Sequence, residues 1–485
     1  MTHRLAPLML FSATLALTRP SLSPAWEPAT THAGLTEQAA LSSKLQTRLV
    51  EQLGLPRGLF EPLIVPPQDA VSLFTVLRTH NPTDGYVPDQ RGRLYALGWL
   101  VAGAAIADAP LSFAGNHFLD PSSGKGLTDA SVSSARQRLR RRRVARAAGQ
   151  DMARQGIAAP DWVLHPDNPM NLDGFLAQYE KAVRARTPGE RSRHVAGALL
   201  AAGAILHVLQ DMGSPSHVRN DYAAHLTPLG NDTLDLGSRF ERIASLAFGR
   251  LGVPAPQEGV VSAPDLRSFF TAEDGSGLAD RTAARWFSAN TLPRARRLPT
   301  RLTPEAIQRL LTASLRRPAP EPTLPLDLFA AASPGGAHLA NEQGVCLAGY
   351  RVVRSTLAWF LDDECMLDQI RAILPEVARY STGLLDWLFR GALDLSRTGQ
   401  NLVATSPGLK LGAGKVEFLW DDNLGVRTSY HTVDAEPMAK GDVTARAPLP
   451  PEAATRITVL FRGVDASGQP LVAAGTSSYP IPTGD

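Results

Sequence analysis

The sequence predicts a mainly α-helical protein that ends in a small antiparallel β domain. Segments rich in alanine and leucine, separated by Pro, Gly, Asn and Asp, give a helical pattern from about Gly34 to Gly391. Beyond Arg390, β-branched and polar residues alternate around Asp-Asn and Ser-Gly turn signals. We therefore expect a helical bundle over residues 26–395, followed by a β-sandwich-like domain over residues 402–485.

The first segment of the chain predicts export. Residues 1–25 carry Arg4 near the start, an apolar run from Leu5 to Leu17, and small residues up to Ala25 at cleavage positions. The run is shorter than the ~20 residues that a membrane span needs, so we prefer a cleaved signal peptide to an anchor. A secreted or periplasmic protein whose mature chain begins at Trp26 is the expected result.

Two central helices are expected inside the bundle. The segments LYALGWLVAGAAIA and VAGALLAAGAIL are apolar nearly all round and too short to span a bilayer. We expect no transmembrane span. The first segment ends at Asp108 and the second at His207, which is how a bundle places a metal site in its core.

The charge balance gives little support to a nucleic-acid partner. A formal net charge of +3 over 485 residues is small for such a partner. The basic run Arg136–Gln150 fits an anionic phosphate surface, although such runs are more often solvated faces or loops. The two cysteines, Cys346 and Cys365, are equally compatible with one disulfide and with two buried thiols.

The segment LHVLQDMGSPSH is the best indication of function. His207 and Asp211 lie four residues apart, so on a helix they share a face and can reach one cation. The Gly-Ser-Pro triplet that follows breaks the helix and turns His217 back towards the same cavity. A lone buried histidine is more often satisfied by a neighbouring carboxylate, but three donors at this spacing favour a metal site.

Other stretches offer further donors of the kind that zinc prefers. The stretch WEPATTH supplies Trp26 and His32, ADAPLSFAGNH supplies Asp108 and His117, and LGSRFE supplies Glu241. An N-terminal amine ordinarily loses its proton with a pKa of ~7.7–8.0, so a metal can displace that proton at modest cost.

The order of these motifs resembles that of the bacterial zinc-dependent phospholipase C family, a helical fold shared with the single-strand-specific nucleases. The resemblance covers about Trp26 to Glu241. It includes a mature N-terminal Trp, the segment HFLDP, similar to the family's HFYDP, and a full match to H-x3-D-x5-H. It implies one zinc held by Asp108, His117, His207 and Asp211, a second by Trp26, His32 and a bridging Asp211, and a third by His217 and Glu241.

Two positions depart from the family pattern. The family has a His four residues before the Glu, and this chain has Gly237 there. The third position is then filled by His225, filled by water, or not occupied. Asp108, to which the resemblance also assigns a general-base role, lies closer to His117 in sequence than in the best-known members.

The expected function is that of a secreted zinc phosphodiesterase that hydrolyses phospholipid head-group phosphodiesters. Two cations ~3.5–4 Å apart can clamp a phosphodiester and lower the pKa of a water towards ~7. We prefer phospholipid to nucleic acid because NHFLDPSSGKG resembles the phospholipase side, and the chain lacks the several disulfides expected of the nucleases. The alternatives are a nuclease or nucleotidase, and a metal-bound binding protein without turnover. The β domain is compatible with a peripheral contact with a membrane or a polymer surface, and equally with a stability cap or a secretion-related module that binds no ligand.

Overall fold

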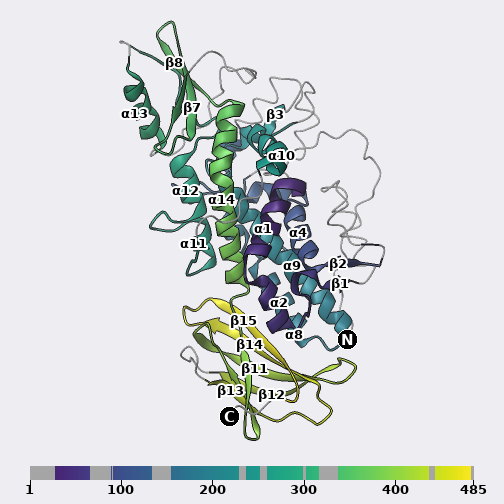
Figure 1. The fold of residues 1–485 in the computed structure, drawn as a ribbon. Helices are drawn as coiled ribbons and strands as arrows, with labels where there is room; N and C mark the ends of the chain where they lie inside the picture. The colour runs from purple at the N-terminus through teal and green to yellow at the C-terminus, as the bar shows by residue number, and fades with distance from the viewer. Residues whose placement is uncertain are drawn as a thin grey trace.

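The computed structural model describes residues 28–65, 89, 91–133, 155–228, 236–251, 259–298, 302–315, 337–435 and 443–481. Helices dominate the first part of the chain and antiparallel sheets the last, as the sequence predicts (Figure 1). The proposed signal peptide over residues 1–25, Trp26 and the basic run Arg136–Gln150 lie outside the described residues.

The helical elements are separated by short loops and by a few small strands. In chain order they are η1 (Pro28–His32), α1 (Ala33–Ser42), α2 (Leu45–Leu53), η2 (Gly58–Phe60), α4 (Ala96–Ile106), η4 (Leu111–Asn116), α7 (Ala159–Trp162), α8 (Leu172–Arg184), α9 (Pro188–Gln210), η5 (Asp211–Gly213), η6 (Tyr222–Leu226), α10 (Arg239–Leu251), α11 (Leu266–Phe270), α12 (Leu278–Arg285), α13 (Pro304–Leu315) and α14 (Asp363–Leu388).

The strands form antiparallel sheets. They are β1 (Pro62–Ile64), β2 (Arg93–Tyr95), β3 (Thr227–Pro228), β4 (Leu236–Gly237), β5 (Arg296–Arg297), β6 (Ala337–Ala340), β7 (Cys346–Val353), β8 (Thr356–Phe360), β9 (Asp394–Thr398), β10 (Asn401–Thr405), β11 (Leu411–Asp421), β12 (Arg427–Ala435), β13 (Val443–Pro448), β14 (Arg456–Asp465) and β15 (Pro470–Ser478).

The apolar helices α4 and α9 lie in the centre of the helical part. Their backbones lie in close contact. A Cβ added to Gly103 would lie only 2.1 Å from the carbonyl oxygen of Leu200. A Cβ on Gly203 would lie 1.9 Å from that of Leu100. Glycine at both positions therefore permits an approach that side chains would prevent, and the C-terminal ends of the two helices come together.

Local capping explains where α9 begins. Thr187 and Glu190 form a reciprocal capping box, and Pro188 occupies the first turn, where its missing N–H costs nothing. Within the described residues, one stretch, Pro188–Gly213, is long and apolar enough to cross a membrane, and 89% of its apolar window is buried in the protein. Such burial is that of a core helix, so the stretch indicates no membrane span.

A four-stranded sheet interrupts the expected helical pattern. Its strand order is β5-β8-β7-β6, and α14 follows it directly. The helical pattern expected from about Gly34 to Gly391 is therefore wrong for Ala337–Phe360, where β-branched and aromatic residues favour strands. Cys346 and Cys365 form a disulfide that joins β7 to the first turn of α14. Of the two alternatives that the sequence allows, one disulfide or two buried thiols, the structure has the disulfide.

The last part of the chain consists of two sheets with strand orders β13-β10-β9 and β12-β11-β14-β15. Apolar side chains from both sheets, among them Leu402 and Phe461, share one core. The hairpin β11–β12 turns at the Asp-Asn sequence and β14–β15 at the Ser-Gly sequence, where Gly468 adopts a φ of +80°. The turn signals of the sequence are confirmed here.

Candidate metal centre

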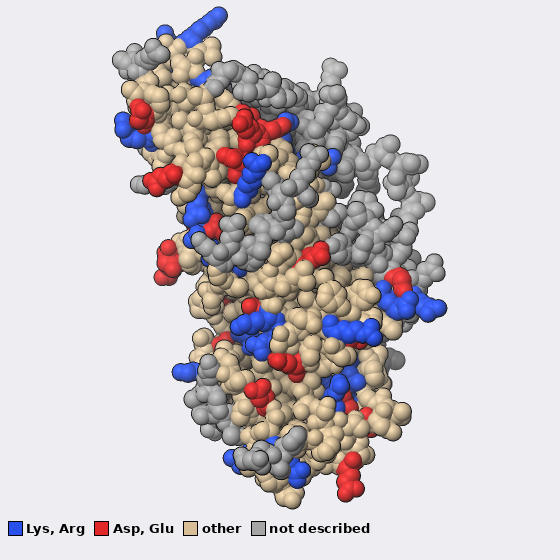
Figure 2. Space-filling view, in the orientation of Figure 1, with Lys and Arg blue, Asp and Glu red and all other residues tan. Residues whose placement is uncertain are grey.

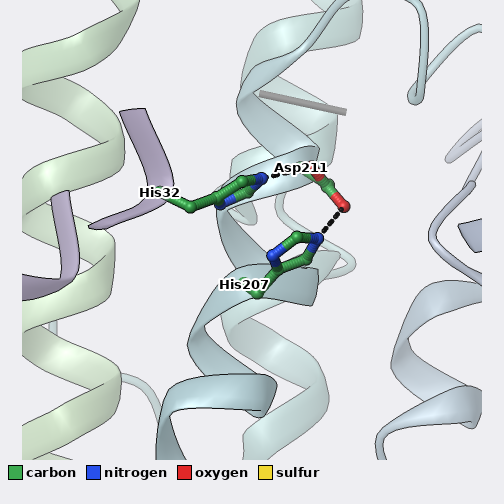
Figure 3. A group of neighbouring side chains, drawn as sticks. All are labelled: His32, His207 and Asp211. Carbon is green, nitrogen blue, oxygen red and sulfur yellow. Dashed lines mark ion pairs between the residues drawn. The ribbon is translucent and has the colours of Figure 1, made fainter. Parts of the chain in front are cut away.

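Side chains from four separate segments meet in the interior of the helical part. His32 ends η1, Asp108 follows α4, His117 follows η4, His207 lies in the last turn of α9, and Asp211 begins η5. All five side chains are buried. Figure 3 shows the imidazoles of His32 and His207, which stack at 3.7 Å between centroids, turned towards the carboxylate of Asp211.

The carboxylate of Asp211 divides these donors into two sets. Its Oδ2 lies 3.0 Å from Nδ1 of His117 and 3.3 Å from Nε2 of His207. Its Oδ1 lies 3.3 Å from Nε2 of His32. Asp108 joins the first set, with Oδ1 3.2 Å from Nδ1 of His117 and Oδ2 3.4 Å from Nε2 of His207. The two oxygens of Asp211 therefore face different histidines.

Hydrogen bonds on the far side of two rings determine which nitrogen faces the carboxylates. His207 donates through Nδ1 to the carbonyl oxygen of Ala104 at 2.7 Å. His32 donates through Nδ1 to Oε1 of Gln210 at 2.7 Å, and Nε2 of Gln210 donates to Oγ1 of Thr36. In the neutral rings, Nε2 then carries a lone pair directed at the carboxylates.

The atoms that face the centre of this cluster fit a divalent cation. Buried polar atoms normally have a hydrogen-bond partner. Here Nε2 of His32, Nε2 of His207, both carboxylate oxygens of Asp108 and Oδ1 of Asp211 are buried without one. Imidazole lone pairs opposite carboxylate oxygens need a proton or a cation between them, and these donors suit zinc.

The pKa values of these side chains, considered without a bound cation, also favour the binding of a cation. Burial alone would raise the pKa of Asp108, but the charges of His207 and His117 outweigh it and lower that pKa to about 2. Burial alone would lower the pKa of His207, but Asp211 and Asp108 raise it to about 10. Burial lowers the pKa of His32, and the charge of His207 adds to the effect. Asp108 and Asp211 therefore both carry negative charge inside the cluster, which attracts positive charge.

A separate group of donors forms around Glu241, which points inward from the first turn of α10. Nε2 of His217 lies 3.8 Å from Oε1 of Glu241, and Nδ1 of His225 lies 3.4 Å from Oε2. His217 donates through Nδ1 to the carbonyl oxygen of His117. The turn after η5 thus places His217 beside Glu241, the residue with which the resemblance pairs it, while its charge also acts on Asp211.

His225 comes close to Glu241 from an element that the spacing of the sequence does not identify. It lies in η6, whereas Gly237, four residues before Glu241, lies in β4 and has no side chain to offer. Nε2 of His217, Nε2 of His225 and Oε2 of Glu241 are buried without a hydrogen-bond partner. Three buried groups among the described residues can thus hold a metal: His32, His207 and Asp211; Asp108, His117 and His207; and His217, His225 and Glu241.

Sequence reasoning missed the residues that orient the ligands. Gln210 and Ser214 lie inside the LHVLQDMGSPSH segment, and Ser214 donates to Oε1 of Glu241 at 3.0 Å. Gln210 is a polar residue at the end of an otherwise apolar helix, which is the indication that could have identified it. Trp26, a predicted ligand, lies outside the described residues.

Buried groups of histidine and carboxylate side chains of this kind are candidate sites for a divalent cation. Comparison with known proteins adds little to this classification. No protein-family model and no curated protein matches the chain.

Two solved structures similar to this chain are clostridial alpha-toxins. The alpha toxin from Clostridium absonum is 11% identical over 95% of this chain and 97% of its own, with a TM-score of 0.29. The Clostridium perfringens alpha-toxin isolated from avian strain SWCP is 10% identical over 94% and 98%, also with a TM-score of 0.29. This TM-score is too low to support a functional conclusion, which therefore depends on the geometry of the donors.

Proposed function

We propose that this protein is an exported, zinc-dependent phosphodiesterase that hydrolyses the head-group phosphodiesters of phospholipids. The observation that carries the proposal is the position of Asp211 between two sets of buried donors. One oxygen faces His117 and His207, and the other faces His32. A carboxylate shared in this way is typical of sites in which two cations act on one phosphate group.

The contacts favour one assignment of ligands. His207 can offer Nε2 to one ion only, because its Nδ1 donates to Ala104. We assign His207 to the ion that faces Oδ2 of Asp211, because that oxygen already lies beside His207 and His117. The proposed ligands are Asp108, His117, His207 and Asp211 for the first zinc, and Trp26, His32 and Asp211 for the second.

The group around Glu241 is the proposed third zinc site. His225 occupies the ligand position that, in the family pattern, belongs to a histidine four residues before the glutamate. A His225→Ala variant is expected to bind one zinc fewer than the wild type while it retains the other two. Metal content of the purified protein, measured by mass spectrometry, gives this count directly. An unchanged count would leave His217 and Glu241 without the partner proposed here.

Neighbouring residues hold the proposed ligands in the orientation that phosphodiester hydrolysis at a metal centre needs. Two zinc ions there would bind the phosphate oxygens and lower the pKa of a water molecule to about 7. Ala104 and Gln210 hold the tautomers of His207 and His32, so their ligating nitrogens need no rearrangement. The burial of the ligands keeps bulk water from competing for these positions.

Asp108 has two proposed roles, as a ligand and as a general base. An Asp108→Asn variant separates them, because the amide is nearly isosteric but has neither the charge nor the basicity of the carboxylate. Loss of bound zinc would assign Asp108 to ligation. Retained zinc with lost turnover would assign it to proton transfer, and a fully active variant would exclude both roles.

A His207→Ala variant tests the centre as a whole. It is expected to lose zinc and the hydrolysis of a soluble phosphodiester together, because His207 contacts both aspartates of the cluster. His431→Ala, a change in strand β12, is the matched control and should retain both properties. Turnover that survives in His207→Ala would contradict the assignment of this site.

Export and substrate are part of the same proposal. The disulfide Cys346–Cys365 is typical of proteins that fold in an oxidising compartment. A phosphatidylcholine analogue is expected to be hydrolysed in preference to single-stranded DNA, and the reverse would indicate a nuclease. Full zinc occupancy without hydrolysis of either substrate would indicate a binding protein.

A further inference from the structure

We propose that the tip of the β7–β8 hairpin, with the adjoining strand β5, docks on an anionic lipid bilayer. The choice of a lipid partner rests on the proposed function, whereas the surface itself is defined by its exposure and charge. We call it the arginine tip, and its members are Arg296, Arg297, Arg351, Val352, Val353 and Arg354. Figure 1 shows this hairpin at the end of the molecule opposite the C-terminal sheets.

Strand pairing brings these residues to one end of the sheet. Val352 pairs with Leu357 and Val353 with Thr356, so both valines lie beside the turn. Arg296 and Arg297 pair with the same two residues of β8 from the other side. The turn is tight, because Arg354 and Ser355 adopt φ angles of 47° and 64°, as in two-residue hairpin loops.

Val352 and Val353 add exposed apolar side chains to the arginine tip. Val352 is 50% exposed and Val353 is 56% exposed, although both are large apolar residues in a strand. Val352 pairs with Leu357, which is completely buried, so Val352 continues the face of Leu357 past the edge of the protein core. Val353, the next residue of the strand, exposes its side chain on the opposite face. The hairpin therefore carries an exposed apolar side chain on each face beside its turn, where an external apolar medium can cover them.

The surrounding arginines are not neutralised by described residues. Arg296, Arg297 and Arg354 are exposed, and no described carboxylate forms an ion pair with them or with Arg351. Figure 2 shows blue side chains at the extreme of this end of the molecule without red ones beside them. Arginine binds phosphate and other oxyanions through paired N–H groups, so the charge of the tip fits an anionic surface.

The combination of charge and apolar exposure favours a bilayer over a nucleic acid. A nucleic-acid backbone would engage the arginines but would leave Val352 and Val353 in water. At a bilayer, the valines enter the interface while the guanidinium groups contact the lipid head groups, so both features are used.

Vesicle flotation tests this docking independently of hydrolysis. The probe is a vesicle that contains sulfatide, which is anionic but has no phosphodiester, compared with a neutral vesicle without sulfatide. The wild-type protein is expected to float with the anionic vesicles. Arg296→Ser combined with Arg297→Ser should weaken binding by about fivefold for each arginine removed. Val352→Ser combined with Val353→Ser should weaken it on the order of tenfold.

Two residues of the C-terminal sheets supply matched controls. Leu424, 77% exposed in the β11–β12 turn, and Arg397, half-buried in β9, are changed singly to Ser and should leave vesicle binding unchanged. All these positions are at the surface, so the variants should fold, as circular dichroism would verify. Loss of binding in Leu424→Ser, with none in the tip variants, would overturn the proposal and place the membrane contact in the C-terminal sheets.

Hydrolysis of a soluble phosphodiester separates this proposal from the function proposed above. The tip variants should hydrolyse it at the wild-type rate, because the tip contributes no donor to the metal groups. Vesicle binding by a protein without turnover would support the docking surface and reject the function. Binding to single-stranded DNA that depends on the arginines but not on the valines, without vesicle binding, would overturn the lipid assignment.

Discussion

At the residue scale, the metal centre depends on side chains that do not themselves face the cluster. Gln210 accepts from Nδ1 of His32 and donates to Thr36, so its amide has a defined orientation. Nε2 of His32 is thereby left to face Asp211. We infer that Gln210 is a positioning residue, since partners of this kind set the tautomer and basicity of a ligating imidazole.

A Gln210→Leu variant is expected to weaken zinc binding about 10–100-fold, because the buried Nδ1–H of His32 loses its acceptor. Competition with a chromophoric chelator measures the dissociation constant. Gln210→Glu keeps an acceptor oxygen and should recover most of the affinity, which a purely structural defect would not show. Gln38→Leu, on α1 near Ser42, is the control and should bind zinc normally. Equal affinity in Gln210→Leu and the wild type would reject the role.

At the element scale, the close approach of α4 and α9 determines where the ligands lie. The backbones meet at Gly103 and Gly203, in the turns that precede Asp108 and His207. This contact brings the carbonyl oxygen of Ala104 within 2.7 Å of His207 Nδ1. Glycine is a poor helix former, so two glycines in buried helices are best explained by the approach they allow.

A Gly203→Ala change is expected to lower the free energy of unfolding although alanine is the better helix former. The helix-propensity gain is ~1 kcal/mol, whereas the new Cβ meets a backbone oxygen and overpacking costs ~1–3 kcal/mol or more. Zinc affinity should fall as well, because the helices must separate. Gly189→Ala in the first turn of α9 has open space around it and should not lower stability. Urea unfolding measures both variants, and a stabilised Gly203→Ala would contradict this account of the helix contact.

At the scale of the whole molecule, the metal groups join segments that are distant in sequence. The donors extend from His32 in η1 to Glu241 in α10, and α14 packs against both α1 and α10. A ligand that binds only the folded chain stabilises it by mass action. Bound zinc should therefore stabilise the helical part as a whole.

Removal of metal by a chelator is expected to lower the melting temperature of the wild-type protein. Free zinc at 100 times the dissociation constant contributes about 2.7 kcal/mol per site. Calorimetry of the protein with and without chelator measures the shift. In His207→Ala the same treatment should produce a smaller shift, since less zinc is bound. Identical melting of the wild-type protein under both conditions would show that the buried groups hold no metal.

Part of the fold and the site could be predicted from local pattern. The helical character of α4 and α9 follows from their composition, and the last hairpins turn at Asp-Asn and Ser-Gly signals. The i,i+4 spacing of His207 and Asp211 places both on one face of a helix end, as the structure shows. The roles assigned to these residues as metal ligands remain predictions.

Other features could not be predicted because they depend on contacts between distant segments. The strands β6–β8 occupy a region that was expected to be helical, since short apolar runs have similar local patterns in both structures. The sequence left open whether His225, water or nothing fills the third position, and it did not identify Gln210, because the positions of both depend on how η6 and η1 pack. The same is true of the disulfide, which needs β7 beside α14.

The sequence by itself determined that His32, Asp108, His117, His207 and Asp211 are candidate ligands, because residue type and spacing limit which side chains can share a cation. Only the tertiary structure decided that the oxygens of Asp211 face different histidines and that His217 joins His225 at Glu241. The physical reason is that a ligand set is defined by distances of a few ångströms across separate helices. Those distances are set by the packing of the helices, above all by the glycine contact between α4 and α9.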